Sequence, residues 1–265
     1  MSHEEEHPSD DNNELTRDIF KEQFRARAHQ GMVNSARSVA KMTHELIASE
    51  LAANPGYQLV LVGHSLGGGV ASILGTFWKH TFPGTLTYAY GCPCVAPLNA
   101  YPTIDESVIS VVGEGDPFSC LSLGHLADVT NAISQLCEDP ELRNNILNRT
   151  KDTKIEEMSE DDITWCKHTL ELLSPLSTES DNSVSTEKFY PPGRVLHMKG
   201  NLFSSDLGEV SITEVQSEDV FRHLKLHPRM FDLSLHIPHR YEVLLTRIWS
   251  RVRSRTLNTS TNNNN

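Results

Sequence analysis

The chain has 265 residues, enough for one domain with a substantial core, and a formal net charge of −12. Residues 1–14 carry six acidic and no basic residues, and residues 151–190 carry ten acidic and four basic ones, so these two segments hold the whole net charge. This acid surplus argues against nucleic acid as a partner. No apolar run reaches the roughly 18 residues of a membrane span, and the acidic, polar N-terminal segment is not typical of a signal peptide.

The five cysteines are odd in number and lack the paired spacing of a zinc site, so no metal is expected on them. Free thiols in a reducing compartment are the expected state. We therefore expect the protein to be cytoplasmic, or peripheral to the cytoplasmic face of a membrane. The cysteines are Cys92, Cys94, Cys120, Cys137 and Cys166.

Residues 1–27 are predicted to be a disordered acidic tail, and residues 32–51 a helix with apolar residues on one face. Apolar segments at 59–62, 86–90 and 108–112 then predict strands. Because helical segments separate strands that are apolar throughout, the pattern predicts an α/β fold whose mostly parallel sheet is covered by helices on both faces.

The C-terminal half predicts a mixture of helices, strands and polar segments. Helices are expected at 126–137, 163–173 and 241–252, and strands at 194–199 and 210–215. A predominantly polar stretch separates the first two helices. Residues 174–187 are predicted to be a mobile linker, and the low-complexity tail 256–265 to be disordered.

The most informative stretch is Gly63–His64–Ser65–Leu66–Gly67, which fits the pattern G-x-S-x-G. A predicted strand precedes it and a helix-compatible run, 70–78, follows, as a hydrolase nucleophile elbow requires. The serine would then occupy a strained turn in which side chains at Gly63 and Gly67 would collide with neighbouring elements. The Leu66 backbone N–H would face a developing oxyanion at the helix N-terminus.

A nucleophilic serine needs a histidine base and a carboxylate that orients it, in the chain order Ser, acid, His in this fold class. Asp116 is the favoured acid because it directly follows the predicted strand 108–112, where ligand-facing loops leave a parallel sheet. Glu114 is the nearest rival, and Asp105 and Asp128 are less well placed.

Four histidines near the C-terminus are candidates for the base: His223, His227, His236 and His239. His236 is favoured because it precedes the last amphipathic helix, and His239 is the alternative. His64 lies inside the elbow, where it is expected to pack or to hydrogen-bond beneath the turn.

Several of these segments, in order, resemble class 3 lipases, and within them the sn-1-specific diacylglycerol lipases and their plant relatives. The resemblance covers about residues 28–248. It implies an α/β-hydrolase domain, 28–255, with Ser65, Asp116 and His236 as the catalytic triad and the Leu66 N–H in the oxyanion hole. It also implies cleavage of a glycerolipid acyl ester through an acyl-enzyme, without metal or organic cofactor. The matching segments are 28–32, 62–69, 110–116, 228–231 and 236–238.

The same resemblance implies that the polar insert 139–190 is a lid or modification segment; a tolerated surface insertion is the alternative. Related lipases carry spanning helices or strands before the segment that matches 28–32. We therefore expect an N-terminally truncated chain, with an exposed hydrophobic sheet edge and one oxyanion donor missing.

Two other functions remain open. The first is a phospholipase A1 or a carboxylesterase on the same scaffold, and the second a catalytically impaired, lipase-like regulatory protein. Contact with a membrane surface would rely on an exposed apolar rim and on the basic C-terminal helix, whose arginines could instead form a solvated face. The sequence does not indicate an oligomeric state.

Overall fold

The computed structural model describes residues 28–98, 100, 107–150, 158–173, 187–200, 210–221 and 233–262. The predicted tail 1–27 and most of the predicted linker 174–187 lie outside these ranges.

A five-stranded sheet organises the fold, with its strands in the order of the sequence. The strands β1 (Val60–His64), β2 (Leu86–Tyr90), β3 (Val108–Gly113) and β4 (Arg194–Lys199) are parallel, and β5 (Ser211–Val215) runs antiparallel to β4. All five coincide with predicted strands to within two residues. The predicted α/β class with a mostly parallel sheet is confirmed.

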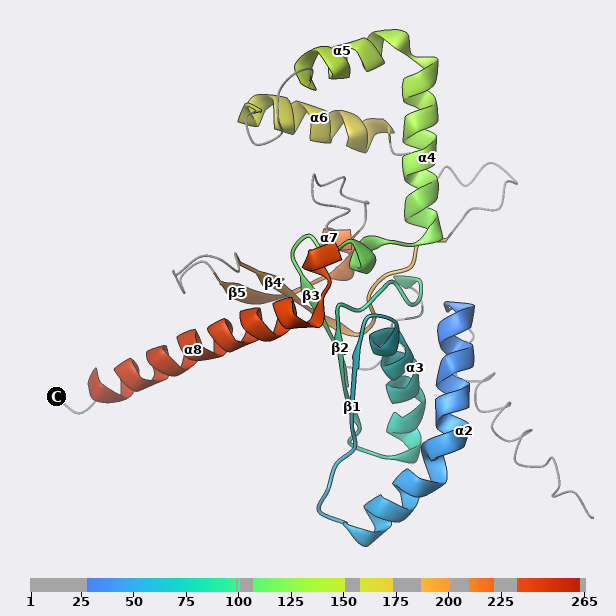
Figure 1. Cartoon of the computed structure of the whole chain (residues 1–265), viewed down its shortest axis with the longest axis vertical. Coiled ribbons are helices and arrows are strands. Elements are labelled where there is room, and N and C mark those ends of the chain that lie inside the picture. Colours follow the sequence, from blue (N-terminus) through green and yellow to red (C-terminus); the bar gives the residue numbers. More distant parts are fainter. Residues whose placement is uncertain are drawn as a thin grey trace, which may run out of the picture.

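Two helices cover one face of the sheet. The helix α3 (Leu66–Thr81) packs on β1 and β2, and α2 (Gln30–Ala53) packs on α3 (Figure 1). Met32, Ala36 and Ala40 are the buried residues of α2, and their four-residue spacing places them on one helical face. They join the α3 core residues and the inward side chains of β2 and β3 in one apolar cluster.

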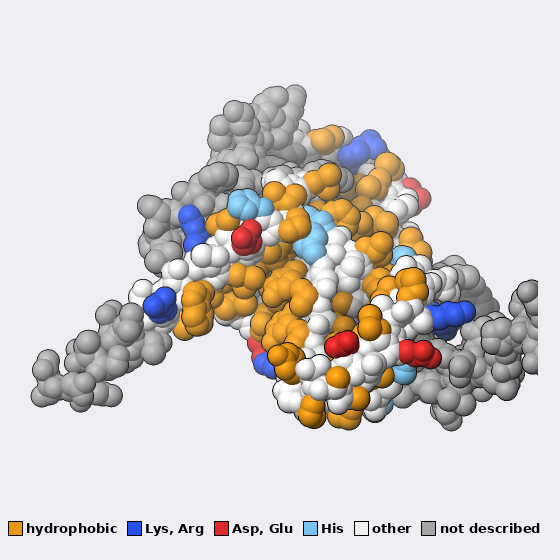
Figure 2. Space-filling model, turned by 60° about the horizontal axis from the view of Figure 1, so that its bottom comes forward, with side chains coloured by type: hydrophobic (Ala, Val, Ile, Leu, Met, Phe, Trp, Pro, Cys, Tyr) orange, Lys and Arg blue, Asp and Glu red, His pale blue; other side chains and the backbone are white. Residues whose placement is uncertain are grey.

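The opposite face is covered by α8 (Pro238–Asn262), mainly over β3, β4 and β5, and Tyr90 of β2 also packs against it (Figure 1). Among the described residues no helix covers this face at β1, where Val62 is 66% exposed. The prediction of a sheet covered on both faces is therefore wrong at this strand. A space-filling view shows hydrophobic side chains gathered beside α8 (Figure 2).

The segment after β3 forms three helices that project away from the sheet (Figure 1). They are α4 (Leu123–Glu138), α5 (Pro140–Thr150) and α6 (Glu160–Leu173). The polar stretch after α4, in which the sequence predicts no helix before residue 163, contains α5, which begins with Asp139 accepting a hydrogen bond from the Leu142 N–H. An acidic N-cap followed by proline is a local signal for a helix start.

The insert thus contains helices that are joined to each other. Arg149 on α5 forms a 2.8 Å ion pair with Asp162 on α6, and its guanidinium lies 4.3 Å from the centre of the Trp165 ring. These exposed contacts orient α5 against α6, and on their own they contribute little to the free energy of unfolding.

The last helix is longer than predicted at both ends. Its start at Pro238 uses proline's preference for the first helical position. Its end at Asn262 lies inside the segment 256–265 that the sequence predicts to be disordered. Each residue added to an existing helix gains one backbone hydrogen bond, which lets a helix continue through residues of modest propensity.

The turn between β1 and α3 is strained, as the elbow motif predicts. Ser65 has φ 55° and ψ −128°, and it is the one residue other than glycine with positive φ in the described ranges. A Cβ on Gly63 would lie 2.2 Å from the Gly67 carbonyl oxygen, so only glycine fits there. At Gly67 the expected collision is wrong, because no described atom lies within 4 Å of an added Cβ.

This difference predicts opposite outcomes for two similar substitutions. Gly63→Ala should prevent folding or lower the free energy of unfolding by several kcal/mol, because the Gly67 carbonyl belongs to the backbone and has little room to move. Gly67→Ala should change it by about 1 kcal/mol or less, since alanine favours a helical first turn. Urea denaturation of both variants checks this, and equal stabilities would contradict the steric account.

All five cysteines are free thiols, as expected. Cys92 and Cys94 are buried, and burial raises the pKa of Cys92 to about 12 and that of Cys94 well above its usual range. Cys137, on α4, is exposed.

Alkylation should therefore discriminate among the thiols. At pH 8 iodoacetamide should label Cys137 rapidly, while Cys92 and Cys94 stay unlabelled because they are protonated and inaccessible. Peptide mass spectrometry of native and urea-unfolded protein measures this. Rapid native labelling of Cys92 would show that this part of the core is open.

Candidate active site

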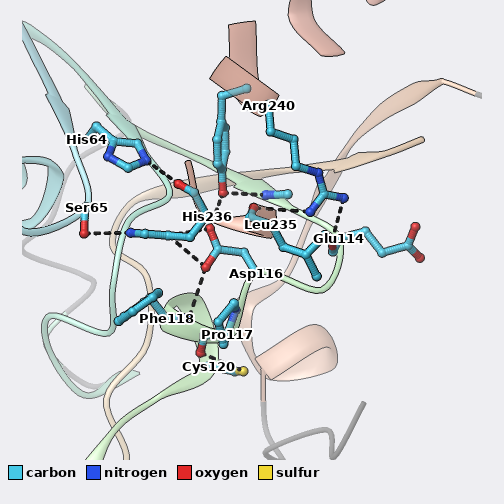
Figure 3. Close-up of polar contacts among 12 residues, drawn as sticks. His64, Ser65, Glu114, Asp116, Pro117, Phe118, Cys120, Leu235, His236 and Arg240 are labelled. Carbon is cyan, nitrogen blue, oxygen red and sulfur yellow. Dashed lines mark hydrogen bonds and ion pairs between the residues drawn. The ribbon is translucent and has the colours of Figure 1, made fainter. Parts of the chain in front are cut away.

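The structure brings Ser65, Asp116 and His236 together, although they lie on three separate segments (Figure 3). Ser65 follows β1, Asp116 follows β3, and His236 precedes α8. The His236 Nε2 lies 2.7 Å from the Ser65 Oγ, and the His236 Nδ1 lies 2.8 Å and 3.0 Å from the two Asp116 carboxylate oxygens. The imidazole therefore bridges the hydroxyl and the carboxylate.

The partners of His236 determine which of its nitrogens carries the proton. An ionised carboxylate only accepts hydrogen bonds, so Nδ1 carries the hydrogen that faces Asp116. In the neutral ring Nε2 then presents a lone pair to the Ser65 hydroxyl. This is the arrangement in which an imidazole can take a proton from serine.

The Asp116 side chain is buried and accepts hydrogen bonds from several sides (Figure 3). The Phe118 N–H donates to Oδ1 at 3.0 Å, and the Tyr241 hydroxyl donates to Oδ2 at 2.5 Å. These bonds replace the water that a buried carboxylate has lost.

His236 is held by packing and by a backbone contact. The Phe118 ring lies on its imidazole with centroids 4.2 Å apart. The His64 Nε2 lies 2.7 Å from the His236 carbonyl oxygen, which only accepts, so His64 donates there. His64 thus forms a hydrogen bond beside the turn, as expected. Gly91, at φ 53°, leaves the space that both rings use, because a Cβ there would lie 3.1 Å from the His236 Cε1.

The rival acids and bases lie elsewhere. Glu114 points an exposed side chain away and contributes only its carbonyl oxygen (Figure 3). Asp128 pairs with Lys188. His239 is exposed and lies 3.5 Å from Glu242 on the same helix. Asp105, like His223 and His227, lies outside the described residues.

Two neighbours of the site, Arg240 and Tyr241, were not identified as functional from sequence. The buried Arg240 guanidinium donates to the carbonyl oxygens of Leu235 and Glu114, and so ties the loop of His236 to the loop of Asp116. For this arginine, the alternative of a solvated basic face is wrong. In the sequence, Tyr241 follows the candidate base by five residues. Nothing in that pattern distinguishes it from a tyrosine that only packs in the core.

The Leu66 backbone lies at the first position of α3, directly after Ser65. The first N–H groups of a helix have no acceptor within the helix, and they lie at the positive end of its dipole. The Leu66 N–H can thus donate a hydrogen bond to a negatively charged atom of a group bound at Ser65.

Exposed apolar side chains flank the three residues. Leu66 is next to Ser65, Leu233 and Ile237 lie on either side of His236, and Leu121 and Leu123 follow the short helix after Asp116. Exposed apolar side chains beside a polar site favour a substrate with an apolar part. Among the helices that the structure describes, none is both long and apolar enough to cross a bilayer.

Comparisons with known proteins find similarity to lipases. The family model for class 3 lipases matches residues 5–123. Diacylglycerol lipase-beta of Mus musculus is 28% identical over 122 residues, which are 44% of this chain and 18% of that protein. Diacylglycerol lipase-alpha of Homo sapiens is 29% identical over 185 residues, 65% of this chain and 18% of that protein. The chain thus spans about a fifth of the length of these relatives.

Among solved structures, an MDLA mutant from Penicillium cyclopium aligns with a TM-score of 0.48 at 17% identity, over 79% of this chain and 57% of that one. The family match extends across the elbow and the segment of Asp116. Over residues 5–123, the chain is therefore similar in sequence to the class 3 lipases.

Proposed function

We propose that the chain hydrolyses an acyl ester of a glycerolipid resembling diacylglycerol, with Ser65 as nucleophile, His236 as general base and Asp116 as the carboxylate that orients the base. The observation that carries the proposal is the His236 imidazole, whose Nε2 lies 2.7 Å from the Ser65 Oγ while its Nδ1 lies 2.8 Å from Asp116. The similarity to diacylglycerol lipases supports the lipid class of the substrate.

In the first half of the reaction, the Ser65 Oγ attacks the ester carbonyl carbon and its proton passes to the His236 Nε2. The carbonyl oxygen becomes an oxyanion, which accepts a hydrogen bond from the Leu66 N–H. When the tetrahedral intermediate collapses, the ester C–O bond breaks. The leaving alcohol takes the proton from His236, and the acyl group remains on Ser65.

In the second half, water attacks the acyl-enzyme carbonyl and gives its proton to the His236 Nε2. Collapse of the second intermediate returns this proton to the Ser65 Oγ and releases the fatty acid. Asp116 keeps its negative charge throughout, and this charge stabilises the imidazolium that forms in each half.

A fluorophosphonate probe tests the nucleophile. The wild-type chain should be labelled at Ser65, whose Oγ displaces fluoride from the phosphorus, and Ser65→Ala should abolish labelling because the hydroxyl that is phosphonylated is gone. Gel fluorescence and peptide mass spectrometry measure the label. A well-folded wild-type chain that takes up no label would instead support a lipase-like regulatory protein.

Two histidine variants test the base. His236→Ala should lower kcat for a p-nitrophenyl ester by about 10³-fold or more, whereas His239→Ala should leave it near the wild-type value. Asp116→Asn should also lose most activity, because an amide can favour the wrong imidazole tautomer. Steady-state kinetics checks this, and an equal loss in the His239 variant would reject the assignment.

We further propose that the apolar side chains around the site contact a lipid surface, which places the protein at the periphery of a membrane. When an exposed leucine is buried between the headgroups and acyl chains of a bilayer, the free energy of binding becomes more favourable roughly in proportion to the apolar area buried. Leu123 is 73% exposed and Leu233 is 62% exposed, so each has apolar surface to bury. The five free thiols fit the cytoplasmic side.

Vesicle flotation tests this contact. The double variant Leu123→Ser, Leu233→Ser should reduce the fraction of protein that floats with vesicles of phosphatidylcholine and diacylglycerol several-fold. The matched control Met42→Ser, Leu46→Ser removes two exposed apolar side chains of α2, remote from the site in the fold, and should float as the wild type does. Equal loss in the two double variants would mean that the contact is nonspecific.

A further inference from the structure

Tyr241 lies beneath the candidate triad, in the first turn of α8. Its side chain is buried, and its hydroxyl accepts a 3.0 Å hydrogen bond from the Gly113 N–H while donating to the Asp116 Oδ2 at 2.5 Å. The hydroxyl thus has one defined donor and one defined acceptor. Its hydrogen is directed to the carboxylate.

From these contacts we infer that Tyr241 is a positioning residue: its hydroxyl fixes the Asp116 carboxylate and limits how strongly that carboxylate stabilises the His236 imidazolium. The inference deepens the proposed function and rests on it for its catalytic meaning. The hydrogen bonds themselves do not depend on any reaction.

Competition at one oxygen atom explains the second part of this role. The Asp116 Oδ2 is 2.5 Å from the Tyr241 hydroxyl and 2.8 Å from the His236 Nδ1, so two donors share its negative charge. An O–H donor to a carboxylate forms one of the stronger hydrogen bonds in proteins. With this donor removed, more charge would remain on Oδ2 to face the imidazole. The imidazolium would then persist to higher pH.

The phenol can act as a donor only while it is protonated. Burial, followed by the charge of Asp116, raises the pKa of Tyr241 well above its usual range. The hydroxyl hydrogen is therefore present at every pH at which an ester hydrolase would be assayed.

The position of Tyr241 is fixed by its neighbours. Arg240, the residue before it, holds the carbonyl oxygens of Leu235 and Glu114. On the other side of the ring, His64 and Tyr90 lie edge-on, with centroids 5.8 Å and 6.4 Å away. The phenol therefore has little freedom to turn away from Asp116.

Other titratable or charged groups also surround the Asp116–His236 pair, and a pH experiment must separate them from Tyr241. They are His64 on β1, Tyr90 on β2, the Cys92 thiol after β2, Glu114 after β3 and Arg240 on α8. Of these, His64 is the one histidine. Its ring gives its own signals in a histidine spectrum.

The test is Tyr241→Phe in the full chain, which keeps the ring and removes the hydroxyl. Histidine ¹H–¹⁵N spectra recorded between about pH 5 and 9 should show the His236 titration midpoint raised by about half a pH unit. With a p-nitrophenyl ester, kcat should fall roughly tenfold, because the loss of a fixed Asp116 carboxylate misplaces the base and outweighs the stronger stabilisation of the imidazolium. KM should change little, since the lost contact does not bind substrate.

Tyr90→Phe is the matched control, because it removes a hydroxyl from a ring that packs on Tyr241 and should change neither the midpoint nor kcat. If Tyr241→Phe does not fold, 3-fluorotyrosine at position 241 gives the opposite sign: its more acidic phenol is a stronger donor and should lower the midpoint.

An active wild type whose midpoint and kcat are unchanged by Tyr241→Phe would overturn the inference. An inactive wild type would reject the proposed function. In that case the midpoint alone decides, with a shift supporting the positioning role of Tyr241 and no shift overturning it.

Discussion

The buried Asp116 carboxylate is the point on which the site depends. It lies where the chain leaves β3, and it accepts hydrogen bonds from the Phe118 N–H on its own loop, from the Tyr241 hydroxyl on α8 and from the His236 Nδ1. A buried charge without such donors would cost several kcal/mol. To keep the carboxylate hydrogen-bonded, the loop before α8 and the first turn of that helix must therefore stay against β3. The same contacts direct the His236 Nε2 to the Ser65 Oγ.

The nucleophile depends on a different constraint, which is local. Ser65 is held at positive φ because β1 ends and α3 begins within a single residue, and the chain passes so closely over Gly63 that no Cβ fits there. The strain is compensated by the packing of α3 against β1 and β2, and of α2 against α3. The elbow and the carboxylate are thus supported by different halves of the domain, which meet through His236.

The helix α8 has two roles in the fold. Its first turn supplies Arg240 and Tyr241 to the site, and its next turn packs Leu244 into the cluster that covers β3 and β4. Stability and site geometry are therefore coupled in this helix. Further along, Trp249 and Val252 are exposed, as are Val60 and Val62 on the uncovered face of β1. An apolar sheet face beside an apolar helix flank is a surface that soluble domains usually cover.

The sequence by itself determined the five strands and most of the helices and predicted Ser65 and Asp116, because these depend on local periodicity, on a five-residue turn motif and on position after a strand. It was wrong about the space at Gly67, and it did not identify the helix α5 after Asp139, where the local signal was weak. Only the tertiary structure decided which histidine meets Ser65, since the two residues are 171 positions apart. It also decided that Arg240 is buried and that Tyr241 donates to Asp116. Such contacts depend on how α8 lies against β3, and no local pattern specifies the packing of two distant elements.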